Sequence, residues 1–205
     1  MKTKEWYIRK SKDVYIKKAS KLGLVSRSAF KLNEIEKKYK LLRFSNSILE
    51  LGASPGGWTQ VILKIKSNQD FTLICIDKDD LQISKNKNIF FIKKEFSNNE
   101  TIVNEINKFY KKKFDIILSD ISPNTTGHSN TDHLKIIKIA EEILQFSLSN
   151  INKNGNLIIK IFQGSQEKNL VSQLKKNFKS VNYFKPQSSR KTSSEIYLIS
   201  LNYKY

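Results

Sequence analysis

A run of small residues follows the first apolar segment of the chain and could receive a nucleotide-like molecule. Residues 52–57 are all Gly, Ala, Ser or Pro, and a tryptophan comes directly after them. Small side chains let the backbone approach a ligand closely, although a tight strand-to-helix turn would also use glycine and proline. The spacing is not Gly-x-Gly-x-x-Gly, which disfavours a nicotinamide dinucleotide. We therefore expect a different nucleotide-like cofactor at Gly52, Ala53, Pro55, Gly56, Gly57 and Trp58.

Two acidic residues end the next apolar segments and could bind the adenosine part of such a cofactor. Asp77 follows the glycine loop at the distance expected of an acid that accepts hydrogen bonds from ribose hydroxyls. Glu95 could accept a hydrogen bond from an adenine amino group, and we expect Phe96, the next residue, to bind the cofactor as well. Either acid taken alone is more often a solvated carboxylate at the end of a strand. Together with the loop, they predict an adenosine site.

The elements that would position these residues alternate between short apolar runs and segments of helical spacing, which is typical of βαβ units in a parallel sheet. Gly155, in the polar run 152–155, is expected to stop a helix and form a turn. We expect strands at 47–51, 71–77, 89–92, 114–119, 156–161, 181–184 and 195–202, and helices at 26–42, 58–66, 98–110, 132–150 and 166–178.

The predicted topology brings charged residues to one edge of the sheet. Asp120 closes the fourth strand and Lys160 lies late in the fifth, so both belong at the carboxyl edge, where ligands bind in open α/β sheets. If the last strand is antiparallel, Glu195 at its start lies on the same edge. A lysine between carboxylates at a ligand-binding edge could act in proton transfer.

The charge of the chain points to a polyanionic partner. Its 37 Lys and Arg residues against 19 Asp and Glu give a formal net charge of +18. Charge alone does not distinguish among RNA, DNA and a membrane surface as the partner. The chain is also rich in Lys and Asn, so a drift in composition that leaves lysines on the solvated surface is a simpler explanation of the charge. Because no apolar run reaches about 18 residues, we expect a soluble protein that does not span a membrane. Cys75 and only two histidines predict no disulfide within the chain and no metal site.

The chain reads as one domain over residues 1–205, with a basic arm at 1–25 and a catalytic core at 26–205. Residues 1–12 of the arm are basic and have no apolar block, which fits an RNA-contacting arm better than a targeting segment. Basic and aromatic residues in it could contact phosphates and unpaired bases, or could form a disordered tail. These residues are Trp6, Tyr7, Arg9, Lys10, Lys12, Lys17 and Lys18.

Five ordered blocks cover nearly the whole chain, at residues 23–32, 49–58, 119–124, 160–164 and 185–190. In these blocks the chain resembles the FtsJ family of ribose 2′-O-methyltransferases, specifically the small bacterial and organellar enzymes that methylate a uridine of large-subunit ribosomal RNA. The resemblance implies an α/β, Rossmann-like class I methyltransferase fold. It implies a seven-stranded, mostly parallel sheet with helices on both faces and an antiparallel last strand.

The resemblance also implies the cofactor and the active-site residues. The cofactor is S-adenosyl-L-methionine, surrounded by the glycine loop, Asp77, Asp120 and the acid at Glu95. The family usually has Asp preceded by Gly at this last position, where this chain has Lys94 and Glu95. The catalytic tetrad implied by position is Lys31, Asp120, Lys160 and Glu195.

A ribose 2′-hydroxyl is a weak nucleophile, so attack on a sulfonium methyl group needs a base and close alignment. We expect Lys160 to be the base, which requires its ammonium to lose a proton. Lys31 and burial favour the neutral amine, whereas Asp120 and Glu195 favour the ammonium, and the sequence leaves open which dominates. Arg27, Lys31 and Arg190 are expected to contact RNA beside the cleft.

The primary hypothesis is therefore methylation of a uridine 2′-hydroxyl in large-subunit rRNA or an assembling ribosomal subunit. The alternatives are 2′-O-methylation of a tRNA anticodon loop and a non-catalytic, methyltransferase-like RNA-binding protein of ribosome assembly. The intact tetrad argues against the non-catalytic reading. We expect a monomer that needs no metal, with a mitochondrion or another organelle favoured over cytoplasm or nucleus.

Overall fold

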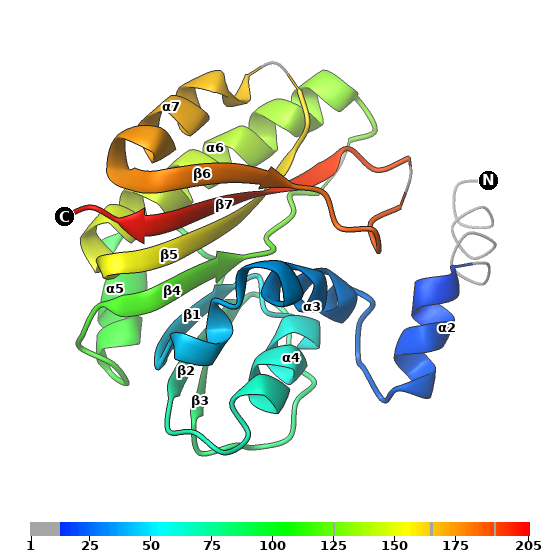
Figure 1. The fold of residues 1–205 in the computed structure, drawn as a ribbon, viewed down its shortest axis with the longest axis vertical. Coiled ribbons are helices and arrows are strands. Elements are labelled where there is room, and N and C mark those ends of the chain that lie inside the picture. The colour runs from blue at the N-terminus through cyan, green and yellow to red at the C-terminus, as the bar shows by residue number, and fades with distance from the viewer. Residues whose placement is uncertain (1–12, 125, 165, 191) are drawn as a thin grey trace.

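A single seven-stranded sheet runs through the computed structural model, which describes residues 13–124, 126–164, 166–190 and 192–205 (Figure 1). The order of the strands across the sheet is β3-β2-β1-β4-β5-β7-β6. Their bounds are β1 (Ser47–Leu51), β2 (Thr72–Asp77), β3 (Ile89–Lys93), β4 (Phe114–Ser119), β5 (Ile151–Phe162), β6 (Phe178–Phe184) and β7 (Glu195–Tyr203).

The direction of the last strand confirms the expected topology. Strands β1 to β5 pair in parallel, whereas β7 lies between β5 and β6 and is antiparallel to both. Glu195, the first residue of β7, is the register partner of Phe162 at the end of β5. The start of β7 therefore lies at the carboxyl edge of the parallel strands, as predicted.

Helices cover both faces of the sheet (Figure 1). Helices α3 (Ser28–Tyr39) and α4 (Gly57–Ile65) pack on one face. The short helix η1 (Leu42–Phe44), between α3 and β1, adds Leu42 to the core on this face. The other face carries α5 (Glu100–Asn107), α6 (Ser129–Asn150) and α7 (Glu167–Asn177). Helix α2 (Val14–Lys21) lies beyond α3, away from the sheet. Among the described helices, none is both long enough and apolar enough to cross a membrane.

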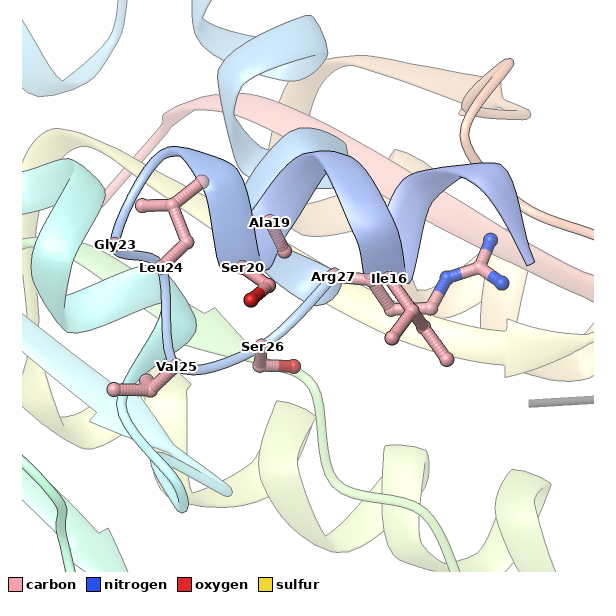
Figure 2. Close-up of a pocket in the computed structure, with 8 residues that line it drawn as sticks. All are labelled: Ile16, Ala19, Ser20, Gly23, Leu24, Val25, Ser26 and Arg27. Atoms are coloured by element: carbon pink, nitrogen blue, oxygen red, sulfur yellow. The ribbon is translucent and has the colours of Figure 1, made fainter. Parts of the chain in front are cut away.

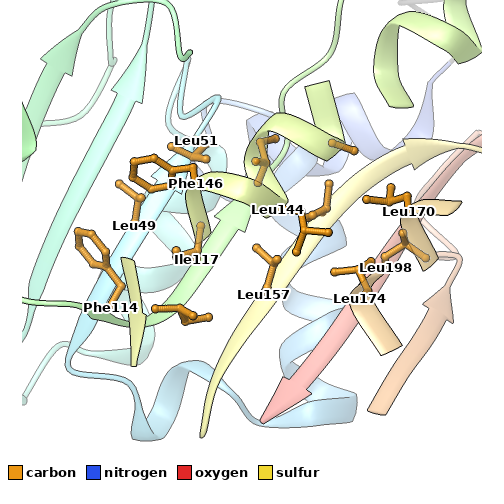
Figure 3. Close-up of a cluster of buried hydrophobic side chains, with 14 of the residues drawn as sticks. Leu49, Leu51, Phe114, Ile117, Leu144, Phe146, Leu157, Leu170, Leu174 and Leu198 are labelled. Atoms are coloured by element: carbon orange, nitrogen blue, oxygen red, sulfur yellow. The ribbon is translucent and has the colours of Figure 1, made fainter. Parts of the chain in front are cut away.

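Successive strand residues enter two separate hydrophobic cores. In β5, Leu157 packs under α6 and α7, as Figure 3 shows, whereas Ile158 packs on the side of α3 and α4. Leu49 and Ile48 of β1 divide in the same way. Since neighbouring residues point to opposite faces and both faces are covered, burial favours apolar residues at nearly every position of these strands. This explains the continuous apolar runs from which the strands were predicted.

The expected turn at Gly155 is wrong. Helix α6 ends at Asn150, and Ile151 is already extended and opens β5. Residues 152–155 form an irregularity within the strand, where the register with β4 shifts and Asn154 has a φ of 62°. A Cβ atom at Gly155 would lie 2.7 Å from the carbonyl oxygen of Asn152. The glycine therefore serves a close backbone approach in a bulge, a role glycine also fills in turns.

Candidate active site

A cavity of about 290 Å³ opens at the carboxyl edge of the sheet. Five of the residues predicted to bind a cofactor line it: Gly52, Asp77, Glu95, Phe96 and Asp120. The sequence reasoning missed the other residues that line it, which come from β2, from the loops after β1, β2 and β4, and from helix α6. These additional residues are Ser54, Ile76, Lys78, Asp79, Ile121, Ser122, Ile139 and Glu142.

A hydrogen bond from a backbone amide joins the glycine loop to Asp77 beside this cavity. Gly52 has a φ of +77°, and a Cβ atom there would lie 2.8 Å from the backbone nitrogen of Ile121. Only glycine therefore fits without a shift of the neighbouring chain. The two carboxylate oxygens of Asp77 accept hydrogen bonds from the amides of Ser54 (2.8 Å) and Asp79 (2.9 Å). These bonds fix the orientation of the carboxylate and leave lone pairs for a ligand.

The cavity is acidic although the chain is strongly basic. Its lining contains five carboxylates and one lysine, whereas the whole chain has a net charge of +18. The carboxylates belong to Asp77, Asp79, Glu95, Asp120 and Glu142. Such a lining repels phosphates and favours a ligand that carries positive charge. The site is therefore suited to a cationic small molecule and not to the RNA backbone.

The remaining residues of the glycine loop do not line the cavity. Pro55, Gly56 and Gly57 lead into α4, and Ala53 and Trp58 are buried in the core on the α3 side. The indole of Trp58 donates a hydrogen bond to the carbonyl oxygen of Ser28 at 3.0 Å. In this structure Trp58 therefore ties α4 to the start of α3.

The four residues of the predicted tetrad form two ion pairs. The ammonium of Lys31 lies 2.6 Å from Oε2 of Glu195, and both side chains are nearly buried. The ammonium of Lys160 lies 3.2 Å from Oδ1 of Asp120 and donates a hydrogen bond to the Asp120 carbonyl oxygen at 2.6 Å. Asp120 also lines the acidic cavity, so it joins the ion pairs to the candidate cofactor site.

Tyr197 is a further member of this cluster that the sequence reasoning missed. It is fully buried, and its hydroxyl donates a hydrogen bond to Oδ1 of Asp120 at 2.7 Å. Burial raises the pKa of Tyr197 well above its usual value, and the nearby carboxylates of Asp120 and Glu195 raise it further. Tyr197 lies two residues after Glu195 in β7, and the two-residue period of a strand could have indicated their shared face.

The pKa of Asp120 lies below its usual value. Burial alone would raise it, but the charges of Lys160 and Lys31 and the hydrogen bonds from Tyr197 and Lys160 outweigh burial. Asp120 is therefore a carboxylate at neutral pH. The influence of Lys31 also shows that the two ion pairs act on one another electrostatically.

The two arginines predicted to contact RNA meet at Asp13, which caps the start of α2. Arg27 forms an ion pair with Asp13 and donates a hydrogen bond to the carbonyl oxygen of Ser188. Arg190 lies 3.1 Å from the same carboxylate, and its side chain is half exposed. Burial by itself raises the pKa of Asp13, but the two arginines and a backbone hydrogen bond from Ile16 hold it below its usual value.

A second cavity lies between α2 and the turn that follows it, and Arg27 is the predicted site residue that borders it (Figure 2). On α2, Lys17 and Lys18 are exposed. The other basic and aromatic residues expected to contact RNA in the arm lie outside the described residues. They are Trp6, Tyr7, Arg9, Lys10 and Lys12.

The fold and the cavity define the class of protein, a Rossmann-like α/β protein with a small-molecule site at the carboxyl edge of its sheet. Residues 24–203 match the model of the FtsJ-like methyltransferases. The chain belongs to this family.

Individual relatives agree with the family match. The chain is 40% identical to the ribosomal RNA large subunit methyltransferase E of Wolbachia pipientis, over 93% of this chain and 95% of that protein. It is also 40% identical to the protein of that name in Rickettsia bellii, over 97% of this chain and 88% of the relative. A crystal structure of a ribosomal RNA methyltransferase from Plasmodium falciparum superposes with a TM-score of 0.76 at 35% identity, covering 87% of this chain and 97% of the other.

Proposed function

We propose that this chain transfers a methyl group from S-adenosyl-L-methionine to a ribose 2′-hydroxyl of large-subunit ribosomal RNA, at a uridine. The observation that carries this proposal is that Asp120 both lines the acidic cavity and pairs with Lys160, while the second pair, Lys31 with Glu195, is near enough to lower the pKa of Asp120. The cavity suits a cationic cofactor. The lysine–carboxylate pairs suit transfer of a proton from the ribose hydroxyl and alignment of the ribose. Relatives that are similar over nearly their whole length carry the name of a large-subunit rRNA methyltransferase.

The residues of the cavity fit S-adenosyl-L-methionine. Its volume of about 290 Å³ lies near the lower end of the range of about 300–1,000 Å³ that is common for small-molecule sites. Asp77 would accept hydrogen bonds from the ribose hydroxyls, and Glu95 from the adenine amino group, with Phe96 beside the base. The carboxylates would favour the positive charges of the cofactor's amino acid and sulfonium groups. When bound, the cofactor supplies an electrophilic methyl group.

Lys160, as the neutral amine that remains after its ammonium has released a proton, is proposed to take the proton of the 2′-hydroxyl as the hydroxyl oxygen attacks. It is 5% exposed and already directs its ammonium at two oxygens of Asp120. This geometry fixes the position of the nitrogen, which a general base requires. Asp120, oriented by Tyr197, would hold Lys160 in place, and Lys31 with Glu195 would align the ribose from the side of α3.

RNA is proposed to approach from the side of Arg190 and Lys31, with Arg27 nearby. The excess of basic residues provides the attraction to phosphates, while the acidic cavity excludes them and stays available to the cofactor. We also propose that the protein works as a monomer without a metal ion and in an organelle. The relatives from Wolbachia pipientis and Rickettsia bellii are bacterial and do not bear on the compartment.

Methyl transfer to three RNAs tests the proposal. Assembled large subunits, protein-free large-subunit rRNA and tRNA are each incubated with the protein and labelled S-adenosyl-L-methionine. We expect label in large-subunit rRNA, and label in tRNA alone would overturn the rRNA assignment.

The substitution Lys160→Ala tests the role of that residue. It should reduce methyl transfer by at least about a hundredfold, the lower range of general-base contributions, and leave cofactor binding in calorimetry unchanged. Turnover equal to that of the unmodified protein would refute the role of Lys160.

A further inference from the structure

One face of α3 is hydrogen-bonded to the loop between β6 and β7. Arg27, Lys31 and Glu34 are spaced by four and then three residues, which places them on the same side of the helix. The carboxylate of Glu34 accepts hydrogen bonds from two successive amides of the loop, Gln187 at 2.5 Å and Ser188 at 2.9 Å. Arg27 donates to the carbonyl oxygen of Ser188. The helix therefore holds the Ser188 residue by both its amide and its carbonyl group.

The same loop determines the surroundings of Glu195. The hydroxyl of Ser189 donates a hydrogen bond to Oε1 of Glu195 at 2.8 Å, while Lys31 of α3 pairs with Oε2 at 2.6 Å. One carboxylate oxygen is thus held by the loop and the other by the helix. Glu195 meets both partners only while the loop lies at its present position on α3.

The two hydrogen bonds that Glu34 accepts can hold the β6–β7 loop in its position on α3. Hydrogen bonds from backbone amides to a carboxylate are charge-assisted and about twice as strong as neutral ones. Ser188 is fully buried and Ser189 is 8% exposed, so this part of the loop is packed against the protein. Replacing Glu34 by alanine would leave the amide of buried Ser188 without its acceptor, which is unfavourable, whereas the amide of exposed Gln187 can bond to water instead.

We propose that Glu34 is a positioning residue for methyl transfer: it anchors the β6–β7 loop on α3 and so holds Glu195 between Ser189 and Lys31. This inference rests on the proposed function, because Lys31 and Glu195 are the residues assigned there to align the ribose. Among the residues that the structure describes, none from α3 or from this loop lines the acidic cavity. Loss of Glu34 therefore affects the methyl-transfer step and not the binding of the cofactor.

The chain offers a matched control on the same helix. Glu36 is also a carboxylate of α3 whose oxygen accepts a hydrogen bond from a backbone amide, that of Leu42 at 2.8 Å, away from the β6–β7 loop. The variant Glu36→Ala removes the same charge and a contact of the same kind. The variant Glu34→Gln keeps one oxygen that can accept a hydrogen bond from one of the two loop amides.

The experiment measures kcat on large-subunit rRNA, the dissociation constant of S-adenosyl-L-methionine, and hydrogen exchange of residues 185–194 in each full-length variant. We expect Glu34→Ala to lower kcat by about tenfold or more, equivalent to about 1.4 kcal/mol of transition-state stabilisation, with cofactor affinity unchanged. Exchange in the loop should become faster. Glu34→Gln should give an intermediate kcat, and Glu36→Ala should match the unmodified protein in all three readouts.

Two results would overturn the inference. In the first, Glu34→Ala and Glu36→Ala have the same kcat. In the second, the loop of Glu34→Ala exchanges as slowly as that of the control. If the unmodified protein transfers no methyl group to rRNA while Glu34→Ala still releases the loop, the proposed function fails and the anchoring of the loop stands.

Discussion

Glu50 is a carboxyl group in the middle of the sheet, and its replacement by glutamine should stabilise the protein increasingly as the pH rises. It lies in β1, is 1% exposed, and accepts a hydrogen bond from the hydroxyl of Thr59 at 2.8 Å. Burial raises the pKa of Glu50 to about 8 from an ordinary value of 4.5, outweighing the hydrogen bonds from Thr59 and Cys75. The folded protein therefore keeps Glu50 protonated at neutral pH, whereas the unfolded chain does not.

The sign of the effect follows from proton binding. Between the two pKa values the folded state binds one more proton than the unfolded state, so the contribution of Glu50 to stability falls as the pH rises. The loss is roughly 1.4 kcal/mol per pH unit, or about 2–3 kcal/mol between about pH 5.5 and pH 7.5. Glutamine is neutral at every pH and does not incur this loss.

Urea unfolding of the unmodified protein and of Glu50→Gln at a series of pH values measures this difference. The free energy of unfolding of Glu50→Gln minus that of the unmodified protein should increase by about 2–3 kcal/mol across this range. Asp70→Asn, which removes an exposed carboxylate, should show no such increase. A difference that stays constant with pH would refute the reasoning, because Glu50 would then be equally ionised in both states.

Three further predictions concern the site and its RNA. Asp77→Asn should weaken the binding of S-adenosyl-L-methionine by about tenfold in calorimetry, because one oriented acceptor is lost, and an unchanged affinity would remove Asp77 from the cofactor site. RNA affinity should fall steeply as salt is added, and a flat salt response would contradict the attraction to phosphates. In Arg190→Ala, the slope of the logarithm of the RNA association constant against the logarithm of the salt concentration should be smaller in magnitude by about one. Tyr197→Phe should lower the free energy of unfolding in urea by about 1 kcal/mol, since Asp120 loses a buried hydrogen bond, and unaltered stability would show that this bond contributes nothing.

The parts of the fold set by local pattern could be predicted from the sequence. Strands such as β1 and β4 are covered on both faces, so burial alone dictates their apolar runs. The irregular start of β5 could not be predicted, because Gly155 is compatible with a bulge and with a turn. Pattern alone also does not determine that β7 lies between β5 and β6.

The candidate site was predictable to the extent that strand ends define it. Asp77, Asp120 and Glu195 follow from the carboxyl-edge rule and the direction of β7. Lys31 reaches the site from a helix outside the strand pattern, and only the family resemblance indicated it. Contacts between segments far apart in the sequence, such as Glu34 with Ser188, depend on tertiary packing and required the structure.

Nucleoside analysis of the methylated RNA tests the central claim most directly. Large-subunit rRNA is incubated with the protein and isotopically labelled S-adenosyl-L-methionine, digested to nucleosides, and separated by mass-resolved chromatography. The proposed function predicts that the label is found in 2′-O-methyluridine and is absent when Lys160→Ala replaces the unmodified protein. Label on a nucleobase, or equal labelling by the variant, would contradict it.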